Sequence, residues 1–600
     1  MINEKERKQS FFSTIKSAKY MFGFVWKERL GKLYLLMQVF AAFVSGVFPL
    51  AVTIIPGLII NELMGAMRTD ILILYVGILT GVPVAEKIIG MILTKCLHKL
   101  GNSLGTKFNA DFFDHVASMD YETLEKPDIQ VMRERAGYMM NRFMWTINSS
   151  LSGILSAFFA LIAMSSIIVT LNPFIIVLMV IVIFVNSLAA KRMNQKQYLV
   201  GLEVSKNWRR TSAFIDMFWN FQHAKEFRLF NLKSFVVDMF VKNQTEAHKL
   251  HLKNSMFQEK TNVLNSVTNL IQQIAIYAYV IYNVIARGLA IGSMAIYIAA
   301  MERFSNSLNQ IMGRYIEFSR QSLDIQEMID FMNIPSIHLE TGNKTPIFDK
   351  NSTIEFKNVS FKYPGSENYA LKDMSITIRG DEKLCIVGAN GSGKSTFVKL
   401  LTRLYMPTEG EISLNGVNIT EYDYIKYQRL FAPVFQDFSK FPFSLRDNIV
   451  LASEYNQQRL NEVSEQSGLM PLVNKMPKGF DTQVTKQIDN EGFEPSGGEG
   501  QRIAIARAVY HGAPIFLLDE PTAALDPIAE YEIYTQFSDM ITDKAAVLIT
   551  HRLSAVQLAD KVAVFEAGGL IEYGTHKQLY NNGGTYTEMY KKQAEFYIED

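Results

Sequence analysis

The sequence has few cysteines and almost no excess of charge. Its two cysteines, Cys96 and Cys385, are too few and too far apart to form a disulfide framework. Lysine and arginine number 60 against 59 for aspartate and glutamate, a formal net charge of +1. The sequence therefore lacks the basic excess of a nucleic-acid-binding protein, and no nucleic-acid partner is expected. At 600 residues, the chain exceeds what one hydrophobic core usually organises, so at least two domains are expected.

The first half of the chain lacks charge over long stretches. Residues 33–60, 143–190 and 261–286 contain no charged side chain. At about 20 residues per membrane span, the second run is long enough for two helices, with Asn172-Pro173 as the turn between them. Two further segments are apolar apart from one charged pair each, residues 71–93 and 289–308. The sequence therefore predicts a membrane domain of six helices.

The distribution of lysine and arginine predicts the orientation of these helices. The tail before residue 33 carries eight of them, whereas the loops expected on the opposite side carry only Arg68, none, and Arg287. Because cytoplasmic segments are enriched in basic residues, we expect the N-terminus on the cytoplasmic side of the cell membrane, which is the inner or plasma membrane. The first ten residues are mostly polar, so no cleavable signal peptide is expected, and residues 22–26 are interpreted as part of an interfacial helix.

Two long polar segments, residues 95–142 and 191–260, would then lie in the cytoplasm. Structureless loops of this length are uncommon, so we expect membrane helices that continue past the bilayer before turning back. Residues 119–130 and 212–223 are the candidate turns that would contact a cytoplasmic domain. Ordinary soluble loops are the alternative interpretation.

A soluble domain follows a polar linker that begins near residue 334. Apolar strands are predicted at 354–361, 375–378 and 384–387, and the third runs directly into GANGSGKST, Gly388 to Thr396. This G-x-x-x-x-G-K-[ST] pattern between a strand and a helical pattern predicts a loop that binds nucleotide phosphates. The predicted organisation is a tail (1–32), a membrane domain (33–320), a linker (321–353), a nucleotide-binding domain (354–590) and a second tail (591–600).

Two more strands end in residues suited to phosphate chemistry. The run IFLLDE, 515–520, places Asp519 toward a magnesium shell and Glu520 where it can polarise a water molecule. The strand at 547–550 is followed by His551. A lone histidine after a strand is usually structural, but the strand ends of a parallel sheet gather at the ligand edge.

Together these motifs resemble an ABC transporter half of the exporter type, similar to bacterial multidrug and peptide exporters. They read FKYPG with Tyr363, GANGSGKST, VFQDF with Gln436, PSGGE, LLDEP and THRL, in the family's order and over essentially the whole chain. The resemblance implies a membrane all-α six-helix domain followed by an α/β P-loop NTPase domain. It also implies ATP and Mg²⁺ as cofactors and an ATP-hydrolysing activity coupled to transport.

The resemblance also implies a role for each motif residue. Tyr363 would stack on adenine, Glu520 would be the general base, and His551 would hold the γ-phosphate. Ser395, Gln436 and Asp519 would form the metal site. The phosphates would be bound by Gly388, Asn390, Gly391, Ser392, Gly393, Lys394, Ser395 and Thr396 of one chain, and by Ser496, Gly497, Gly498 and Glu499 of another.

Because one chain has one phosphate loop and one Ser-Gly-Gly segment, the resemblance implies a dimer, of which a homodimer is the expected form. The family usually has leucine and glutamine where this sequence has Pro495 and Glu499. Ser496 followed three residues later by Glu499 predicts a capping box, in which the glutamate turns back to the helix start. We therefore expect that this segment still binds phosphate, although its helix cap differs from the one usual in the family. Ala523, where the family more often has serine, is a mild departure.

The membrane domain offers two candidate polar regions. Glu86-Lys87 and Glu302-Arg303 lie in the inner third of their predicted helices, where they either form a charged cavity floor or extend to the interface. Four amides, Asn265, Asn269, Gln272 and Gln273, followed by Tyr277, recur at helical spacing and either join helices or line a cavity. A peptide or amphipathic molecule would suit such a lining.

The function predicted from the sequence is ATP-driven export by alternating access, with two ATP sites at the dimer interface. An importer built on the exporter fold, for example for siderophore uptake, and an ATP-gated channel or regulator are the alternatives. The catalytic Glu520 favours a pump over a regulator.

Overall fold

The computed structural model describes residues 11–336, 342–486, 488–520, 537, 540–542, 544–550 and 556–594. The chain forms two compact units. The first comprises Met1–Ala117 and Asp128–Ile334, and the second comprises Ser118–Pro127 and Pro335–Asp600. The turn of the first long helical hairpin therefore belongs with the second unit.

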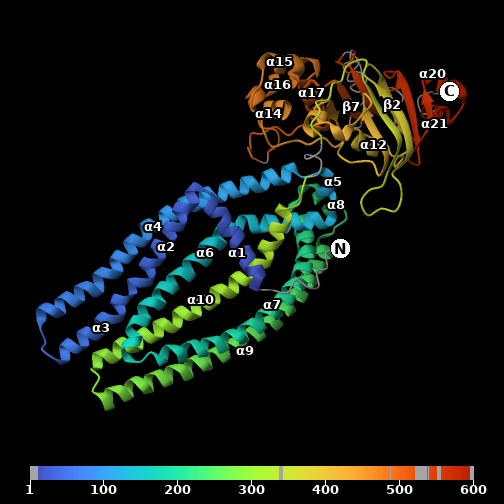
Figure 1. Cartoon of the computed structure of the whole chain (residues 1–600). Helices are drawn as coiled ribbons and strands as arrows, with labels where there is room; N and C mark the ends of the chain where they lie inside the picture. Colours follow the sequence, from blue (N-terminus) through green and yellow to red (C-terminus); the bar gives the residue numbers. More distant parts are fainter. Residues whose placement is uncertain are drawn as a thin grey trace. The chain divides into compact units, whose positions relative to one another are not determined.

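The first unit is a bundle of long helices that run side by side (Figure 1). Its helices are α1 (Phe11–Lys27), α2 (Arg29–Val47), α3 (Pro49–Met64), α4 (Thr69–Ser118), α6 (Pro127–Leu171), α7 (Phe174–Trp219), α8 (Ala224–Leu229), α9 (Lys233–Arg287) and α10 (Ile291–Met332). The 3-10 turn η1 (Phe221–His223) precedes α8, and α5 (Tyr121–Glu125) lies between α4 and α6.

The helices are far longer than a bilayer is thick. Helix α9 has 55 residues and α4 has 50. At 1.5 Å per residue they extend about 83 and 75 Å, more than twice the ~30 Å hydrocarbon core. The expectation that the spans continue as helices into the two polar segments is therefore confirmed, and so is the turn at Asn172-Pro173 between α6 and α7.

Four helices of the described residues are long and apolar enough to cross a membrane, Arg29–Met64, Thr69–Ser118, Pro127–Leu171 and Asn262–Arg287. Helix α7 has a shorter apolar part, Phe174–Asn186. Helix α10, which holds the sixth predicted span, is not among them, because a charged pair and several amides interrupt its apolar residues. It nevertheless packs on the spans: the side-chain Oδ1 of Asn61 in α3 accepts a hydrogen bond of 2.8 Å from the Gly292 N–H.

The interior of the bundle is apolar where α6, α7, α9 and α10 meet, around Met164, Met179, Val280, Met301 and Phe304. Many other large apolar side chains of these helices are exposed, as is expected of surfaces that meet lipid or another protein.

Helix α1 contains the predicted interfacial segment. Its Phe24 ring packs edge-on against Phe108 of α4 and Phe143 of α6. The segment is thus helical and anchored to the bundle, and its place at a membrane surface stays a prediction.

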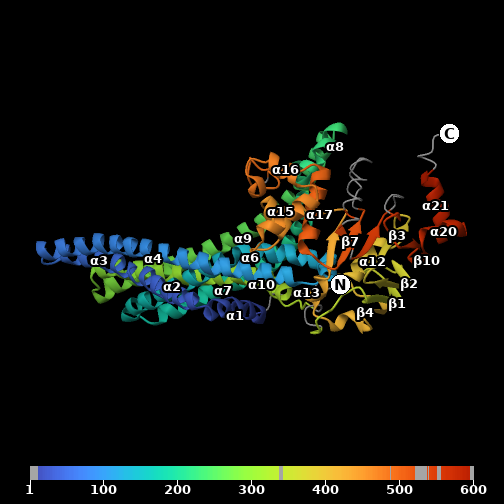
Figure 2. The same ribbon diagram turned by 90° about the horizontal axis from the view of Figure 1, so that it is seen from above.

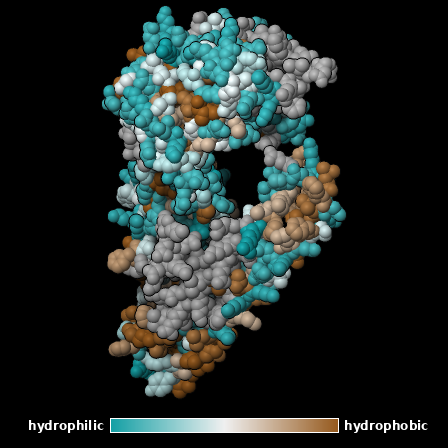
Figure 3. Space-filling model, turned by 90° about the vertical axis from the view of Figure 1, so that its right-hand side faces the viewer, coloured by the Kyte–Doolittle hydropathy of each residue, from teal (hydrophilic) through white to brown (hydrophobic). Residues whose placement is uncertain are grey.

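Helices α7 and α9 form an arm whose end carries α8 (Figure 2). Large apolar side chains gather on this projecting arm (Figure 3). We call the following residues the apolar tip: Phe218, Trp219, Phe221, Leu229 and Phe230, each 48% to 83% exposed.

The second unit contains two β-sheets, one of four strands in the order β2-β1-β4-β5 and one of six in the order β10-β9-β3-β8-β7-β6. The strands are β1 (Thr353–Phe361), β2 (Leu371–Arg379), β3 (Lys383–Gly388), β4 (Glu409–Leu414), β5 (Val417–Asn418), β6 (Phe431–Val434), β7 (Ile515–Asp519), β8 (Ala545–Ile549), β9 (Lys561–Glu566) and β10 (Gly569–Gly574). The small sheet is antiparallel, and the large one is parallel apart from the pairing of β9 with β10. The predicted fold class, a helical membrane domain followed by an α/β nucleotide-binding domain, is confirmed.

Helices cover the large sheet and connect its strands. They are α12 (Lys394–Leu401), α13 (Tyr424–Gln428), α14 (Leu445–Val450), α15 (Gln457–Gln466), α16 (Met470–Lys475), α17 (Gly497–His511), α20 (His576–Asn582) and α21 (Thr585–Ala594), with 3-10 turns η2 (Ile419–Glu421) and η3 (Gly479–Asp481). The five predicted strands coincide with β1, β2, β3, β7 and β8.

Helix α10 continues to Met332, so residues 321–332 of the predicted linker are helical. The helix persists because Leu323, Ile325, Met328 and Phe331 keep one apolar face buried.

Candidate functional site

The parallel strands of the large sheet end at one edge, where most of the predicted site residues lie. Strands β3, β8 and β7 are neighbours, with Ile386 opposite Ile549, and Ile549 opposite Asp519. Strand β6 pairs with β7 on the far side. The phosphate loop after β3, Glu520 after β7 and Gln436 after β6 therefore share this edge, as expected for ligand sites in parallel sheets. His551 lies outside the described residues.

The phosphate loop turns sharply between β3 and α12. Gly393 caps α12 with φ +102°, a conformation that disfavours any side chain, and a Cβ there would also lie 2.6 Å from Leu371 and 2.8 Å from the Ala370 carbonyl. The Lys394 ammonium donates hydrogen bonds to the carbonyls of Gly388 (2.8 Å) and Ala389 (3.0 Å). Burial lowers the pKa of Lys394, against the opposing effect of Glu520 and Asp519.

The loop suits an anion. The Ser392 hydroxyl is buried and has no hydrogen-bond partner among the described residues. The first-turn N–H groups of α12, those of Lys394, Ser395 and Thr396, have no intrahelical partner and point along the helix dipole toward the loop. Gly391 and Gly393 both have positive φ, which helps to curve such loops around phosphate groups. Asn390 and Ser395 are exposed, so both are accessible to a bound nucleotide.

Two acidic residues, Asp519 and Glu520, lie at the same edge of the large sheet. Burial, and after it the neighbouring Glu520, raise the pKa of Asp519 to about 6 against the opposing effect of Lys394. Glu520 has φ +47°, an uncommon left-handed conformation for a glutamate, and its backbone N–H donates to the Ile549 carbonyl at 2.9 Å. Strained backbone held by a sheet is typical of functional positions. Gln436 is exposed two residues beyond β6.

Tyr363 is packed against α12. Its hydroxyl lies 3.0 Å from the Thr396 hydroxyl, and its ring meets the Tyr405 ring edge-on at 5.4 Å. The Lys399 ammonium lies 5.1 Å from the Tyr363 ring centre. The sequence analysis did not single out Lys399, which lies five residues after Lys394, because a lysine in a helix carries no signal of its own.

The same lysine reaches α5, the turn of the first hairpin. Its ammonium lies 5.7 Å from the Tyr121 ring centre and 3.7 Å from a Glu125 carboxylate oxygen, and the Tyr121 ring meets Tyr405 at 5.8 Å. We call Tyr121, Tyr363, Lys399 and Tyr405 the tyrosine–lysine cluster. The expected contact of residues 119–130 with the nucleotide-binding unit is therefore present.

The Ser-Gly-Gly segment begins helix α17 with the predicted capping box. The Glu499 carboxylate accepts hydrogen bonds from the Ser496 N–H (2.9 Å) and hydroxyl (2.7 Å), and the Glu499 N–H donates to the Ser496 oxygen (3.4 Å). Ser496 and Gly497 are exposed, and Gly498 is half-buried. In the described part of the chain, no hydrogen bond or ion pair joins these residues to the phosphate loop.

The predicted amide row in α9 is only partly buried. The carbonyl oxygens of Asn265, Asn269 and Gln272 are buried without hydrogen-bond partners among the described residues, and the Gln272 amide nitrogen lies 3.4 Å from the Ser305 hydroxyl of α10. Gln273 is exposed, unlike the other three. Tyr277 donates a hydrogen bond of 2.6 Å to Glu302 of α10.

The other three residues of the two predicted charged pairs have no such partner. Glu86 is half-buried and Lys87 exposed on α4, and Arg303 is half-buried on α10. None of the three forms an ion pair with another described residue.

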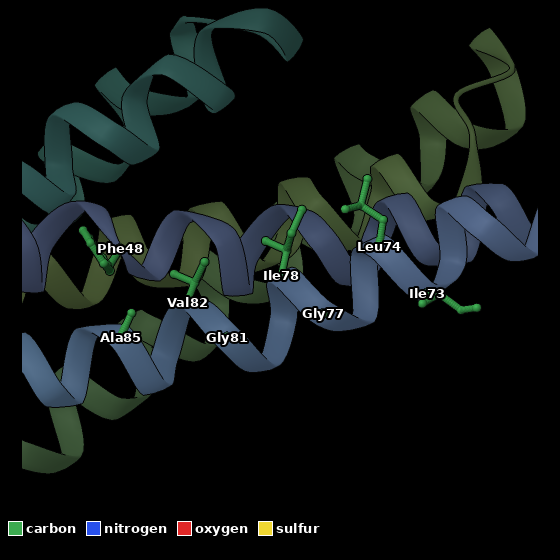
Figure 4. Close-up of a pocket in the computed structure, with 8 residues that line it drawn as sticks. All are labelled: Phe48, Ile73, Leu74, Gly77, Ile78, Gly81, Val82 and Ala85. Atoms are coloured by element: carbon green, nitrogen blue, oxygen red, sulfur yellow. The ribbon is translucent and has the colours of Figure 1, made fainter.

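An apolar groove of about 540 Å³ lies on α4 (Figure 4). Its floor contains Gly77, Gly81 and Ala85 at intervals of four residues, and Phe48 and Val82 flank it. A side chain added at Gly77 or Gly81 would meet nothing within 4 Å. Small residues at this spacing are typical of faces where membrane helices approach closely.

A phosphate loop at the edge of a parallel sheet, joined in one chain to a bundle of apolar helices, defines a membrane-bound P-loop ATPase. Residues 35–308 match the ABC transporter transmembrane region, and residues 371–523 match the family described as ABC transporter. The chain therefore belongs to the ABC transporter family, and it is an ATPase that couples ATP hydrolysis to transport across the membrane.

Similar proteins cover nearly the whole chain. A subtilin transport ATP-binding protein of Bacillus subtilis is 28% identical over 91% of this chain and 89% of its own length. A nisin transport ATP-binding protein of Lactococcus lactis subsp. lactis is 28% identical over 94% of both chains. The solved structure of a bacterial Atm1-family ABC exporter with ATP bound has a TM-score of 0.78, at 19% identity, and covers 94% of this chain and 98% of that one.

Proposed function

We propose that the protein moves a peptide or an amphipathic small molecule out of the cytoplasm, as a homodimer with two ATP sites at the interface of its nucleotide-binding units. The observation that carries this proposal is the incomplete site in a single chain. One chain supplies a phosphate loop with Lys394 and Glu520, and an exposed Ser-Gly-Gly helix start that does not contact that loop. The names of two relatives, which transport subtilin and nisin, favour a peptide cargo.

In this proposal each site residue has a distinct role. The phosphate loop and Lys394 bind the phosphates, Tyr363 stacks on the adenine, and Glu520 takes a proton from the attacking water. Ser496 and the N–H groups that begin α17 bind the γ-phosphate of the partner's nucleotide. Gln436 and His551 complete the site.

A magnesium ion fits this donor set. Ser395 is exposed at the start of α12, and Asp519 and Gln436 follow strands at the same edge. When bound, the ion would neutralise charge on the phosphates during hydrolysis. Ser395 and Gln436 would contact it, and Asp519 would hold its outer ligands by accepting hydrogen bonds.

Two surfaces support a second copy as the partner. The apolar tip exposes large side chains, for example Trp219 at 83%, at the end of a polar arm where lipid does not cover them. We infer that it packs on the nucleotide-binding unit of the second copy. None of the described residues fills the groove at Gly77 and Gly81, and we infer that a membrane helix of the second copy does.

Transport then follows a two-state cycle in the cell membrane, with the N-terminus and the nucleotide-binding unit in the cytoplasm. ATP closes the two nucleotide-binding units, the long helices transmit the closure through turns such as α5, and the cargo pathway turns outward. Hydrolysis by Glu520 resets the cycle.

Reconstitution tests this proposal. ATPase activity of the purified protein in liposomes is measured with a panel of peptides and amphipathic compounds. Stimulation by at least one peptide is expected, and a panel that leaves the rate unchanged throughout would contradict a peptide cargo. Mass measurement in mild detergent, after expression without any other transporter subunit, is expected to give twice the chain mass.

A further inference from the structure

Helix α10 carries a row of polar side chains on a face that the described residues leave exposed. Glu302, Asn306 and Gln310 recur every four residues, and all three are exposed. The opposite face is packed, since Met301 and Phe304 are buried among the apolar side chains of α6, α7 and α9. We call Glu302, Asn306 and Gln310 the polar row.

The predicted sixth span, residues 289–308, contains Glu302 and Asn306 and ends two residues before Gln310. Helix α10 begins at Ile291 beside the end of α3, where Gly292 bonds to Asn61. Glu302 follows 11 residues later (302 − 291) and Gln310 follows 19 residues later (310 − 291). At 1.5 Å per residue these positions are about 16 and 28 Å along the helix, within the ~30 Å hydrocarbon thickness.

Polar groups at this depth are costly against lipid. The amides of Asn306 and Gln310 have no hydrogen-bond partner among the described residues, and an unpartnered amide in hydrocarbon costs several kcal/mol. Ionisable residues within membrane helices normally face a polar interior. A row of this kind is expected to face a hydrated pathway, and its polar residues are the reason that α10 is less apolar than the other spans.

Glu302 is the charged residue of the polar row. Its carboxylate accepts one hydrogen bond, 2.6 Å from the Tyr277 hydroxyl of α9, and no described lysine, arginine or histidine lies within ion-pair distance of it. A carboxylate can accept about four hydrogen bonds, so most of its capacity is unused. Tyr277 fixes the carboxylate in place without neutralising it.

The surface continues into the bundle through Gln272. This residue is only 4% exposed, its nitrogen lies 3.4 Å from the Ser305 hydroxyl, and its carbonyl oxygen has no partner in the described part of the chain. Acceptor oxygens thus occur both inside the bundle, on Gln272 beside Ser305, and on its exposed face, on Asn306.

We propose that the polar row binds the cargo and that Glu302 selects cargo carrying an ammonium or guanidinium group. The amides of Asn306 and Gln310 pair with peptide groups of the same molecule. The cargo class is therefore a cationic amphipathic peptide. This inference rests on the proposed export function, since it places the binding surface in the transport pathway.

The test compares two forms of one amphipathic model peptide, with free lysine amines and with the same amines acetylated. The full-length protein is reconstituted, and ATPase stimulation over each variant's own basal rate is measured against peptide concentration. For the wild type, the half-stimulating concentration of the cationic form should be at least tenfold lower than that of the acetylated form.

The Glu302→Gln variant should lose this preference, through weaker stimulation by the cationic form. Glu246→Gln removes an equal charge from an exposed position of α9 outside the polar row, and should keep it. Asn306→Lys adds a repelling charge one turn away and should raise the half-stimulating concentration of the cationic form at least tenfold, even if Glu302→Gln does not fold.

Preference retained in both Glu302→Gln and Asn306→Lys would overturn the site. A Glu302→Gln protein that keeps the preference but dissociates into monomers would instead show an ion pair with the second copy, which also overturns it. If neither peptide form stimulates or is transported by the wild type, the peptide-export function itself fails. Transport of both forms without preference contradicts only the cationic selectivity.

Discussion

The Glu499 carboxylate accepts hydrogen bonds from both the N–H and the hydroxyl of Ser496. It is therefore directed into the helix cap, and its charge is shared by two donors instead of facing a phosphate. This geometry explains how an acid is tolerated beside an expected γ-phosphate site. It also means that the Ser496 hydroxyl must leave Glu499 before it can donate to a nucleotide.

At the residue scale, Glu499→Gln is expected to leave ATPase activity intact or modestly raised. The glutamine carbonyl can still accept from the Ser496 N–H, but its hold on the hydroxyl is weaker because it is uncharged. Steady-state ATPase assays of the purified protein check this. Ser496→Ala is the contrasting variant and should lower activity, since it removes both the cap, which typically contributes about 1 kcal/mol, and the phosphate donor. Collapse of activity in Glu499→Gln would show that the glutamate has a role of its own.

The residues that the sequence could identify are those with fixed spacing. Lys394, Asp519, Glu520 and the Ser496–Glu499 capping box are all readable because chemistry and local backbone geometry fix their separations. The positive φ of Glu520 is not readable, because it arises from the bond between its N–H and Ile549 in a strand far along the chain.

At the element scale, α12 connects Tyr363, which we propose to stack on adenine, to the turn helix α5. Lys399 of α12 lies between Tyr363 on one side and Tyr121 with Glu125 on the other. A cation over an aromatic ring contributes about 0.5 to 1 kcal/mol at a partly exposed site. The tyrosine–lysine cluster therefore joins Tyr363 to the turn of the first helical hairpin without passing through Gln436.

Lys399→Met keeps the packing of the side chain and removes its charge. We expect the KM for ATP to rise about two- to fivefold, as the loss of ~0.5 to 1 kcal/mol implies, and cargo stimulation of the ATPase to fall. Lys561→Met is the matched control, since Lys561 lies 5.9 Å from the ring centre of Tyr573 in the same unit, outside the cluster. Equal effects of the two variants would contradict a specific role for Lys399.

The sequence predicted the long helices and half of the ten described strands, but not which faces of the helices are packed. Apolar runs and motif positions located β3, β7 and β8 of the large sheet and β1 and β2 of the small one. The spacing of the amide row could not show that Asn265, Asn269 and Gln272 have buried oxygens while Gln273 is exposed. The polar row of α10 has an equally regular spacing, but its importance depends on which face is packed by α6, α7 and α9, and that requires the tertiary structure.

At the scale of the whole molecule, the account requires two copies. Gly81→Leu fills the groove on α4 without a clash inside the chain, because nothing lies within 4 Å of its missing side chain. It should lower the dimer fraction measured by mass in mild detergent. Gly90→Leu adds the same side chain at another open position of α4, nine residues on and about 180° around the helix. A dimer fraction equally lowered by both variants would contradict packing of a second copy in the groove.

The central claim is that hydrolysis by Glu520 drives cargo out of the cytoplasm. The most direct measurement is ATP-dependent uptake of a stimulating peptide into inside-out membrane vesicles, comparing wild type with Glu520→Gln. We predict uptake against a gradient by the wild type. In Glu520→Gln, loss of the general base should lower both uptake and ATPase activity at least about a hundredfold. Undiminished uptake in Glu520→Gln, or ATP-driven loss of peptide from the vesicles, would contradict the account.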